Sequence, residues 1–273
     1  MADNNNSDGF YVNKSTVYIK KAHVPFPMGS IKLRNVINEA KTRLADELTS
    51  WIQLGLENEY EPVTFIDKMG DDYAVCNAAR VSFDKTADTY TPEGNQKLLN
   101  YLASWNHWSP FAHVHIKFKF RAPIFIARQF VKHQVGFAWN EVSRRYVSED
   151  PMFWVPDAWR QRPSNIKQGS VQENAVILEG ERLRYYIDHM REHVKDYRTM
   201  IKDGVCPEQV RAIMPQSMMT EWIWTGSLQA WWRFFELRSD KHAQAECWPY
   251  ADAVQKEISN YFPMCWKAFQ GID

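Results

Sequence analysis

Residues 113–121 alternate strictly between apolar and polar side chains. The apolar side chains are Val114, Ile116, Phe118 and Phe120, and histidine or basic residues occupy the positions between them. Successive side chains of a strand point to opposite faces, so this alternation predicts a strand with one buried side and one solvent-facing side. Residues 219–226, rich in tryptophan and threonine, are also typical of a strand.

Helical spacing of apolar residues predicts the other regular elements. Thr91 is a typical N-cap and Pro92 a typical first helical residue, and Pro123 suits the start of a helix that Gly136 closes. Pro249 should break or kink the last helix. The predicted helices cover residues 31–56, 71–83, 91–105, 123–134, 174–204, 207–215, 227–238 and 241–248.

The balance of these elements predicts the α+β class, because helices outnumber strands. We expect a central, mostly antiparallel sheet flanked by helices, in a single domain at residues 61–273. Residues 1–60 form an N-terminal extension made of a disordered tail and a helix. Residues 151–175 are rich in proline and polar residues, which favours a long surface excursion.

Overall composition limits the function. The chain has 33 basic and 33 acidic residues and a pI near 7.1, which argues against a nucleic-acid-binding surface. The 4 cysteines show no C-x-x-C spacing, so buried free thiols in a reducing compartment are expected. There is no signal pattern and no apolar run of membrane-spanning length, so we expect no membrane association and a cytoplasmic location.

Residues 132–147 concentrate groups that can hold a phosphate and a ring. Ser143, Arg144 and Arg145 offer a hydroxyl and guanidinium forks, which suit a phosphate monoester. The predicted helix before them would place Gln129 one turn from His133 on the same side, as it would Arg128 and Lys132. Three such residues alone would ordinarily be interpreted as a solvated charged loop. The polar side chains on the preceding helix make that interpretation less favoured.

Other clusters have simpler explanations. Three histidines between residues 107 and 115 have no carboxylate beside them, so we expect no metal site. Arg233, Arg238 and His242 could complement the negative end of a helix dipole. The common nucleotide and hydrolase motifs are absent.

Taken together, these blocks resemble the flavin-dependent thymidylate synthases. The signature of that family is Arg-His-Arg, seven or eight residues, then Ser, in a run that ends Asn-Glu-x-Ser-x-Arg-Tyr. Residues 132–134 are Lys-His-Gln, eight residues separate them from Ser143, and residues 140–146 read NEVSRRY. NAARVSF at 77–83, HWSPFAH at 107–113 and the segment from Arg211 to Glu246 resemble further family blocks, over about residues 61–270 in all.

The resemblance implies transfer of a methylene group from methylenetetrahydrofolate to C5 of dUMP, with FAD delivering the hydride and NADPH reducing the flavin. It also implies a homotetramer with shared active sites and no cysteine nucleophile. Arg238 would face the uracil and act as the catalytic residue. The residues implied in dUMP binding are Gln129, Lys132, Glu141, Ser143, Arg144, Arg145, Arg211 and Arg238. Those implied in FAD binding are His107, Ser109, Lys132, His133, Gln134, Glu141, Ser227, Arg233, Leu237 and His242.

Some positions depart from the family pattern. Lys132 keeps a charge but loses the guanidinium fork, and Gln134 loses a charge that would meet the FAD phosphates. Ser227, Gln229 and Arg233 stand where the family has Asn, Arg and Asn, and Arg233 could restore a lost charge. Two alternatives therefore stay open: a related enzyme that methylates or hydroxymethylates another pyrimidine nucleotide such as dCMP, and a non-catalytic nucleotide- or RNA-binding protein.

Overall fold

The computed structural model describes residues 10–13, 16–19, 61–147, 151–156, 159–164, 170–176 and 181–271. The chain divides into two compact units, and each is built from separate stretches of sequence. The first comprises Met1–Asn58 and Ser143–Met218, and the second comprises Glu59–Val142 and Met219–Asp273. The helix predicted at 31–56 and most of the predicted N-terminal tail lie outside the described residues.

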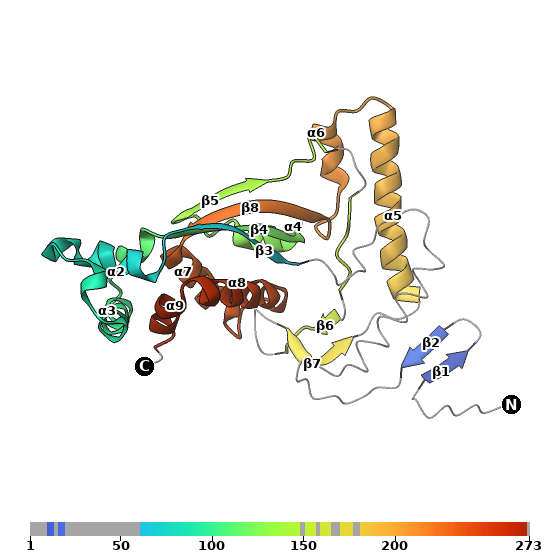
Figure 1. The fold of residues 1–273 in the computed structure, drawn as a ribbon. Helices are drawn as coiled ribbons and strands as arrows, with labels where there is room; N and C mark the ends of the chain where they lie inside the picture. The colour runs from blue at the N-terminus through green and yellow to red at the C-terminus, as the bar shows by residue number, and fades with distance from the viewer. Residues whose placement is uncertain are drawn as a thin grey trace. The chain divides into compact units, whose positions relative to one another are not determined.

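A four-stranded antiparallel sheet forms the centre of the second unit, in the order β3-β4-β8-β5 (Figure 1). The strands are β3 (Val63–Met69), β4 (His115–Pro123), β8 (Met219–Ser227) and β5 (Phe137–Glu141). The long central pair runs in continuous register from His115 opposite Ser227 to Pro123 opposite Met219. The predicted α+β class and antiparallel sheet are confirmed.

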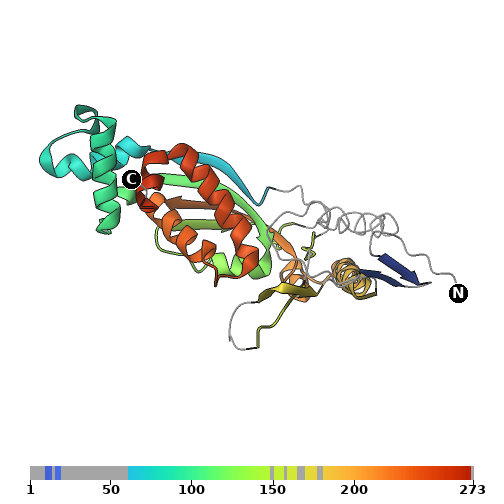
Figure 2. The same ribbon diagram turned by 90° about the horizontal axis from the view of Figure 1, so that it is seen from below.

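One face of this sheet carries the core. Ile116, Phe118 and Phe120 are fully buried, as the alternation of β4 predicted. Trp222 and Trp224 of β8 point to the same side and are buried with them. Helices α7 (Leu228–Ser239) and α8 (Trp248–Tyr261) cover this face, and α9 (Pro263–Phe269) follows (Figure 2). Many of the chain's aromatic side chains therefore serve to pack this core.

Helices α2 (Asp72–Arg80) and α3 (Pro92–Ser104) lie at one end of the sheet in both views (Figures 1 and 2). The hydroxyl of Thr91 accepts from the Gly94 amide at 3.2 Å, so the predicted N-cap is confirmed. The second unit also contains short 3₁₀ helices at Val81–Phe83, Ala87–Thr89, Pro110–Ala112 and Ala245–Cys247.

The helix after β4 is shorter than predicted. Helix α4 spans Ile124–Phe130, and Pro123 is its N-cap and the last residue of β4. The amide of His133 then donates to the Phe130 carbonyl at 2.9 Å, which is a turn and not a helical continuation. Strand β5 must begin at Phe137 to pair with β8, so the chain reverses in the intervening residues and Gly136 adopts φ +80°. Lys132, His133 and Gln134 therefore lie on a turn, and the predicted one-turn spacing with α4 is wrong.

Three further predictions need correction. Residues 151–175 are not a plain excursion, because Phe153 is buried and β6 (Trp159–Gln161) pairs with β7 (Val171–Val176). The helix predicted from residue 174 begins later, since Val171–Val176 pairs as a strand. No continuous helix covers 241–248: its last part is the Ala245–Cys247 turn, and Pro249 lies in the first turn of α8, where proline needs no amide partner.

The described part of the first unit also contains helices and one further strand pair. Helix α5 (Glu181–Lys202) is followed by α6 (Pro207–Val210) and a 3₁₀ helix at Arg211–Ile213, which confirms a short helical segment between the two prolines that bracket it. Strands β1 (Phe10–Asn13) and β2 (Thr16–Ile19) form a hairpin in the N-terminal stretch.

Candidate functional site

Arg238 is fixed by two acceptors, one in the last turn of α4 and one on the turn after that helix. Its Nε donates to Nε2 of His133 at 2.9 Å, and an Nη2 hydrogen reaches the carbonyl of Gln129 at 3.4 Å. Arg238 lies in the last turn of α7 and is only partly exposed. Among the described residues these contacts leave other N–H groups of the guanidinium for a ligand, in an orientation set by the turn.

The imidazole of His133 is neutral. Burial and, to a smaller extent, the positive charge of Arg238 together lower its pKa to about 4. The ring packs edge-on against Phe234, with centroids 5.2 Å apart. A neutral imidazole can accept a hydrogen bond at Nε2, whereas a protonated one could not, so the low pKa and the Arg238 contact agree.

The side chain of Gln129 is held by Gln244 and Cys247, two residues that the sequence did not single out. Its side-chain amide donates to Oε1 of Gln244, and its Oε1 accepts from the thiol of Cys247 at 3.6 Å. Burial raises the pKa of Cys247 to about 11, so the thiol stays protonated and acts as a donor. Gln244 lies in the segment from Arg211 to Glu246 that resembles a family block, and it could have been selected on that ground; Cys247 carried no such signal.

Glu141, at the end of β5, accepts at both carboxylate oxygens. The hydroxyl of Thr220 donates to Oε1 at 2.8 Å, and the indole of Trp139 donates to Oε2 at 3.3 Å. Trp139 is itself stacked on Trp222, with ring centroids 4.2 Å apart. The carboxylate therefore has a fixed direction and keeps lone pairs for a ligand hydroxyl.

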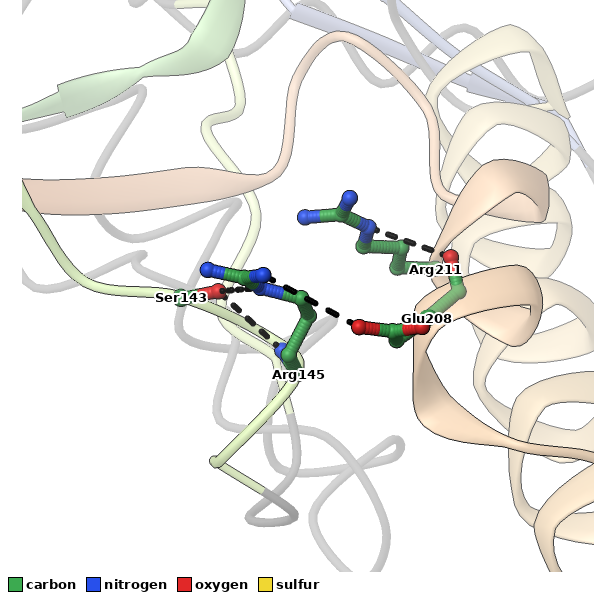
Figure 3. A network of polar contacts seen from close by, with 4 residues as sticks. All are labelled: Ser143, Arg145, Glu208 and Arg211. Carbon is green, nitrogen blue, oxygen red and sulfur yellow. Dashed lines mark hydrogen bonds and ion pairs between the residues drawn. The ribbon is translucent and has the colours of Figure 1, made fainter.

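The first unit contains a separate cationic cluster made of Ser143, Arg145 and Arg211 (Figure 3). The hydroxyl of Ser143 accepts from the backbone amide of Arg145 at 3.3 Å and from its Nε at 3.1 Å. Arg145 Nη1 also lies 3.8 Å from a carboxylate oxygen of Glu208, and Arg211 Nε donates to the Glu208 carbonyl at 3.2 Å. Arg144 is partly buried beside them. Guanidinium forks and a hydroxyl suit a dianionic phosphate.

The residues predicted for FAD lie on several elements of the second unit. Arg233 and Leu237 are exposed and four residues apart on α7, so they share one side of that helix. His107 and Ser109 are exposed in the segment after α3, and Lys132 and Gln134 are exposed on the turn after α4. His242 is exposed and contacts Asp240 at 2.9 Å. Ser227 is different, because it is buried and its hydroxyl caps α7 by accepting from the Ala230 amide at 3.2 Å.

The described residues contain no cluster of three or more histidine, cysteine or acidic side chains arranged to hold a metal ion. None of the helices in the described part of the chain combines the length and apolar character needed to cross a membrane.

The fold is of the α+β class, and each unit presents side chains that could bind a polar or anionic ligand. The family model of the thymidylate synthase complementing proteins matches residues 64–264. A flavin-dependent thymidylate synthase of Kosmotoga olearia is 35% identical over 207 residues, which cover 76% of this chain and 89% of that protein. A flavin-dependent thymidylate synthase of Thermus thermophilus is 35% identical over 208 residues, or 76% and 75% of the two chains.

A solved structure agrees with these relatives. The UMP/dUMP methylase PolB of Streptomyces cacaoi bound with 5-Br dUMP superposes with a TM-score of 0.66 at 27% identity, over 77% of this chain and 94% of that one. The chain belongs to the thymidylate synthase complementing protein family, and it is an enzyme of the methyltransferase type.

Proposed function

We propose that the protein methylates dUMP to dTMP, with methylenetetrahydrofolate as carbon donor, FAD as cofactor and NADPH as reductant. The observation that carries this proposal is the fixed guanidinium of Arg238, held by neutral His133 and by the Gln129 carbonyl. A fixed cation whose other N–H groups can bind a ligand favours the ionised form of a pyrimidine ring, because it stabilises the negative charge that develops on O2 and N3. Arg238 is therefore the proposed catalytic residue.

Other chain residues bind and orient the nucleotide in this proposal. Ser143, Arg145 and Arg211 contact the 5′-phosphate, and Gln129 and Arg144 contribute further donors to it. Glu141 accepts from a ribose hydroxyl, which its two fixed oxygens support. Lys132 supplies positive charge next to the pyrimidine.

The predicted cofactor residues fit a flavin dinucleotide. An apolar side chain such as Leu237 can cover a planar ring, and Arg233 on the same side of α7 can meet a phosphate. Further donors and acceptors come from His107, Ser109, Lys132, His133, Gln134, Glu141 and His242. The hydroxyl of Ser227 already accepts from the Ala230 amide, so Ser227 contributes only its hydroxyl hydrogen. When bound, reduced FAD supplies the hydride that completes the methyl group.

Cys76, Cys247 and Cys265 are buried as expected, whereas Cys206 is exposed, and the buried thiols suit chemistry without a thiolate nucleophile. A nucleophilic cysteine needs a lowered pKa and access to the substrate. Cys247, the cysteine that contacts the Gln129 side chain, is fully buried, and burial raises its pKa to about 11. Its thiol therefore positions Gln129 in this proposal and takes no part in bond formation.

We further propose a homotetramer with shared active sites, as the resemblance implies. Large apolar side chains that a monomer would leave in water support it. Trp105 is 68% exposed, Trp108 51% and Leu237 60%. Partners are otherwise small molecules, with no nucleic acid and no membrane.

The test is a product assay. The purified protein is reconstituted with FAD and supplied anaerobically with NADPH and methylenetetrahydrofolate, and dUMP, UMP and dCMP are offered separately. Mass spectrometry should show that dUMP has gained one methyl group. A methyl or hydroxymethyl gain on dCMP alone would redirect the proposal to another pyrimidine nucleotide. Absence of both product and bound flavin would favour a non-catalytic binding protein.

A further inference from the structure

Glu208 is an acidic residue in a cluster otherwise suited to an anion. Its carboxylate lies 3.8 Å from Arg145, and its backbone carbonyl accepts from Arg211 at 3.2 Å. Figure 3 shows the Arg145 side chain linked to Ser143 on one side and to Glu208 on the other. A carboxylate at a phosphate-binding arginine competes for the same guanidinium edge, so its role needs an explanation.

Ser143 already supplies the orientation of Arg145. The serine oxygen accepts from both the amide and the Nε of Arg145, which uses its two lone pairs. The hydroxyl hydrogen of Ser143 is consequently directed away from Arg145 and can be donated to a phosphate oxygen. The Arg145 guanidinium is thus held at Nε. Its Nη groups can bind either the Glu208 carboxylate or an incoming anion.

The contact with Glu208 is weak enough to be replaced. Its oxygen lies at 3.8 Å, with side chains that are 41% exposed for Arg145 and 65% exposed for Glu208. Exposed pairs of this kind contribute little to stability. A phosphate monoester carries more charge and can engage a guanidinium through two parallel hydrogen bonds.

We propose that Glu208 is an internal competitor, which occupies Arg145 in the absence of nucleotide and yields to the 5′-phosphate. It thereby lowers the affinity for phosphate-bearing ligands. This inference rests on the proposed function in assigning a nucleotide phosphate to Ser143 and Arg145, and it requires only that an anion binds there.

The test compares Glu208→Gln with Glu192→Gln. Glu192 is a matched control, because it lies in the same unit, is 62% exposed and pairs with one cation, Lys195, at 3.0 Å. Isothermal titration calorimetry would measure Kd for dUMP, for inorganic phosphate and for deoxyuridine, which lacks the phosphate. Glu208→Gln should lower Kd for dUMP and for phosphate about two- to fivefold and leave deoxyuridine unchanged, since an exposed pair contributes at most about that much. Glu192→Gln should change none of them.

Unchanged or weaker phosphate binding by folded Glu208→Gln would overturn the proposal, because Glu208 would then position Arg145 and not compete for it. An equal gain in Glu192→Gln would also overturn it, since the effect would be one of net charge. If Glu208→Gln fails to fold by circular dichroism, Glu208→Asp, whose shorter side chain withdraws the carboxylate, should show a gain in the same direction. The product assay separates the two proposals. Phosphate binding can tighten in Glu208→Gln even if the protein does not methylate dUMP, and the protein can methylate dUMP even if phosphate binding in Glu208→Gln does not change.

Discussion

The pairing of His133 with Arg238 can be tested by changing the acceptor alone. Glutamine at position 133 can place its carbonyl oxygen near the position of Nε2, whereas leucine has no acceptor. His133→Leu should weaken dUMP binding about tenfold or more, because a hydrogen bond to a charged group contributes roughly 1.5–3 kcal/mol. His133→Gln should stay within about threefold of the parent.

Bound FAD has to be measured in both variants by its visible absorbance, because His133 is also a proposed flavin contact. Deoxyuridine should lose affinity in parallel with dUMP, since Arg238 is assigned to the ring and not to the phosphate. Equal loss in the leucine and glutamine variants would show that the ring of His133 matters for packing and not as an acceptor.

The same histidine should make stability depend on pH. Its pKa of about 4 in the folded chain is below the ordinary value of 6.5, so the unfolded chain binds the proton more readily between these values. Stability from this group is therefore complete above about pH 6.5, falls as the pH is lowered toward 4, and changes no further below that. In urea titrations the parent should lose about 1–2 kcal/mol more than His133→Gln over this window, allowing for partial exposure. Parallel pH profiles of the two proteins would contradict the assignment.

Residue types were easier to predict from the sequence than their partners. Arg238, His133 and Gln129 were all selected through the resemblance to a known family, and the structure brings them together in one contact group. Glu208 and Cys247 were missed, because a contact over 118 residues, such as that of Cys247 with Gln129, has no local signature. Whether the flavin residues act as the resemblance implies stays a prediction.

At the scale of secondary-structure elements, the local sequence pattern predicted strands and helices reliably where periodic apolar positions or a capping residue marked them. The alternation in β4 predicted which side chains are buried, and the Thr91 cap predicted the start of α3. Pattern failed for α4, whose sequence remains compatible with a helix beyond Phe130. The pairing of β5 with β8 ends it there, and that pairing is a tertiary constraint that helix propensity does not contain.

Gly226 shows how closely β5 approaches β8. A Cβ at this position would lie 2.3 Å from the ring of Phe137, its partner in the register, and 3.0 Å from Trp231 Nε1. Gly226→Ala should lower the free energy of unfolding by about 3 kcal/mol, because the ring has to leave its place against Trp224. Gly94→Ala is the control: its Cβ would meet nothing closer than 3.5 Å in helix α3, so stability should hold or rise by about 0.5–1 kcal/mol. Similar chemical denaturation midpoints for both variants would refute the close approach.

The division of the chain into units was not visible in the sequence. Each unit joins stretches that are far apart, since Glu59–Val142 folds with Met219–Asp273 and the intervening residues belong elsewhere. No change in composition marks the boundaries at Val142 and Met218. Linear patterns report which residues are buried, but the choice of partners across more than 70 residues depends on packing that only the folded chain contains.

Asp72 ties the two stretches of the second unit together. This buried carboxylate, at the start of α2, accepts from the amides of Met264 at 3.0 Å and Cys265 at 2.9 Å, and so caps α9 from 192 and 193 residues away. Asp72→Ala should cost about 2–4 kcal/mol of unfolding free energy, because two charge-assisted hydrogen bonds are lost and two amides are left without their acceptor.

Asp71 provides the local comparison for this last change. It caps only its own helix, by accepting from the Ala74 amide at 2.8 Å, so Asp71→Ala should cost about 1 kcal/mol. Hydrogen exchange would distinguish the two effects. Asp72→Ala should lose protection at the amides of Met264 and Cys265, whereas Asp71→Ala should lose it only at the start of α2. If both variants lost the same stability and left α9 protected, the long-range cap would be a minor contact, and buried side chains such as Trp266 and Phe262 would hold the C-terminal helices in place.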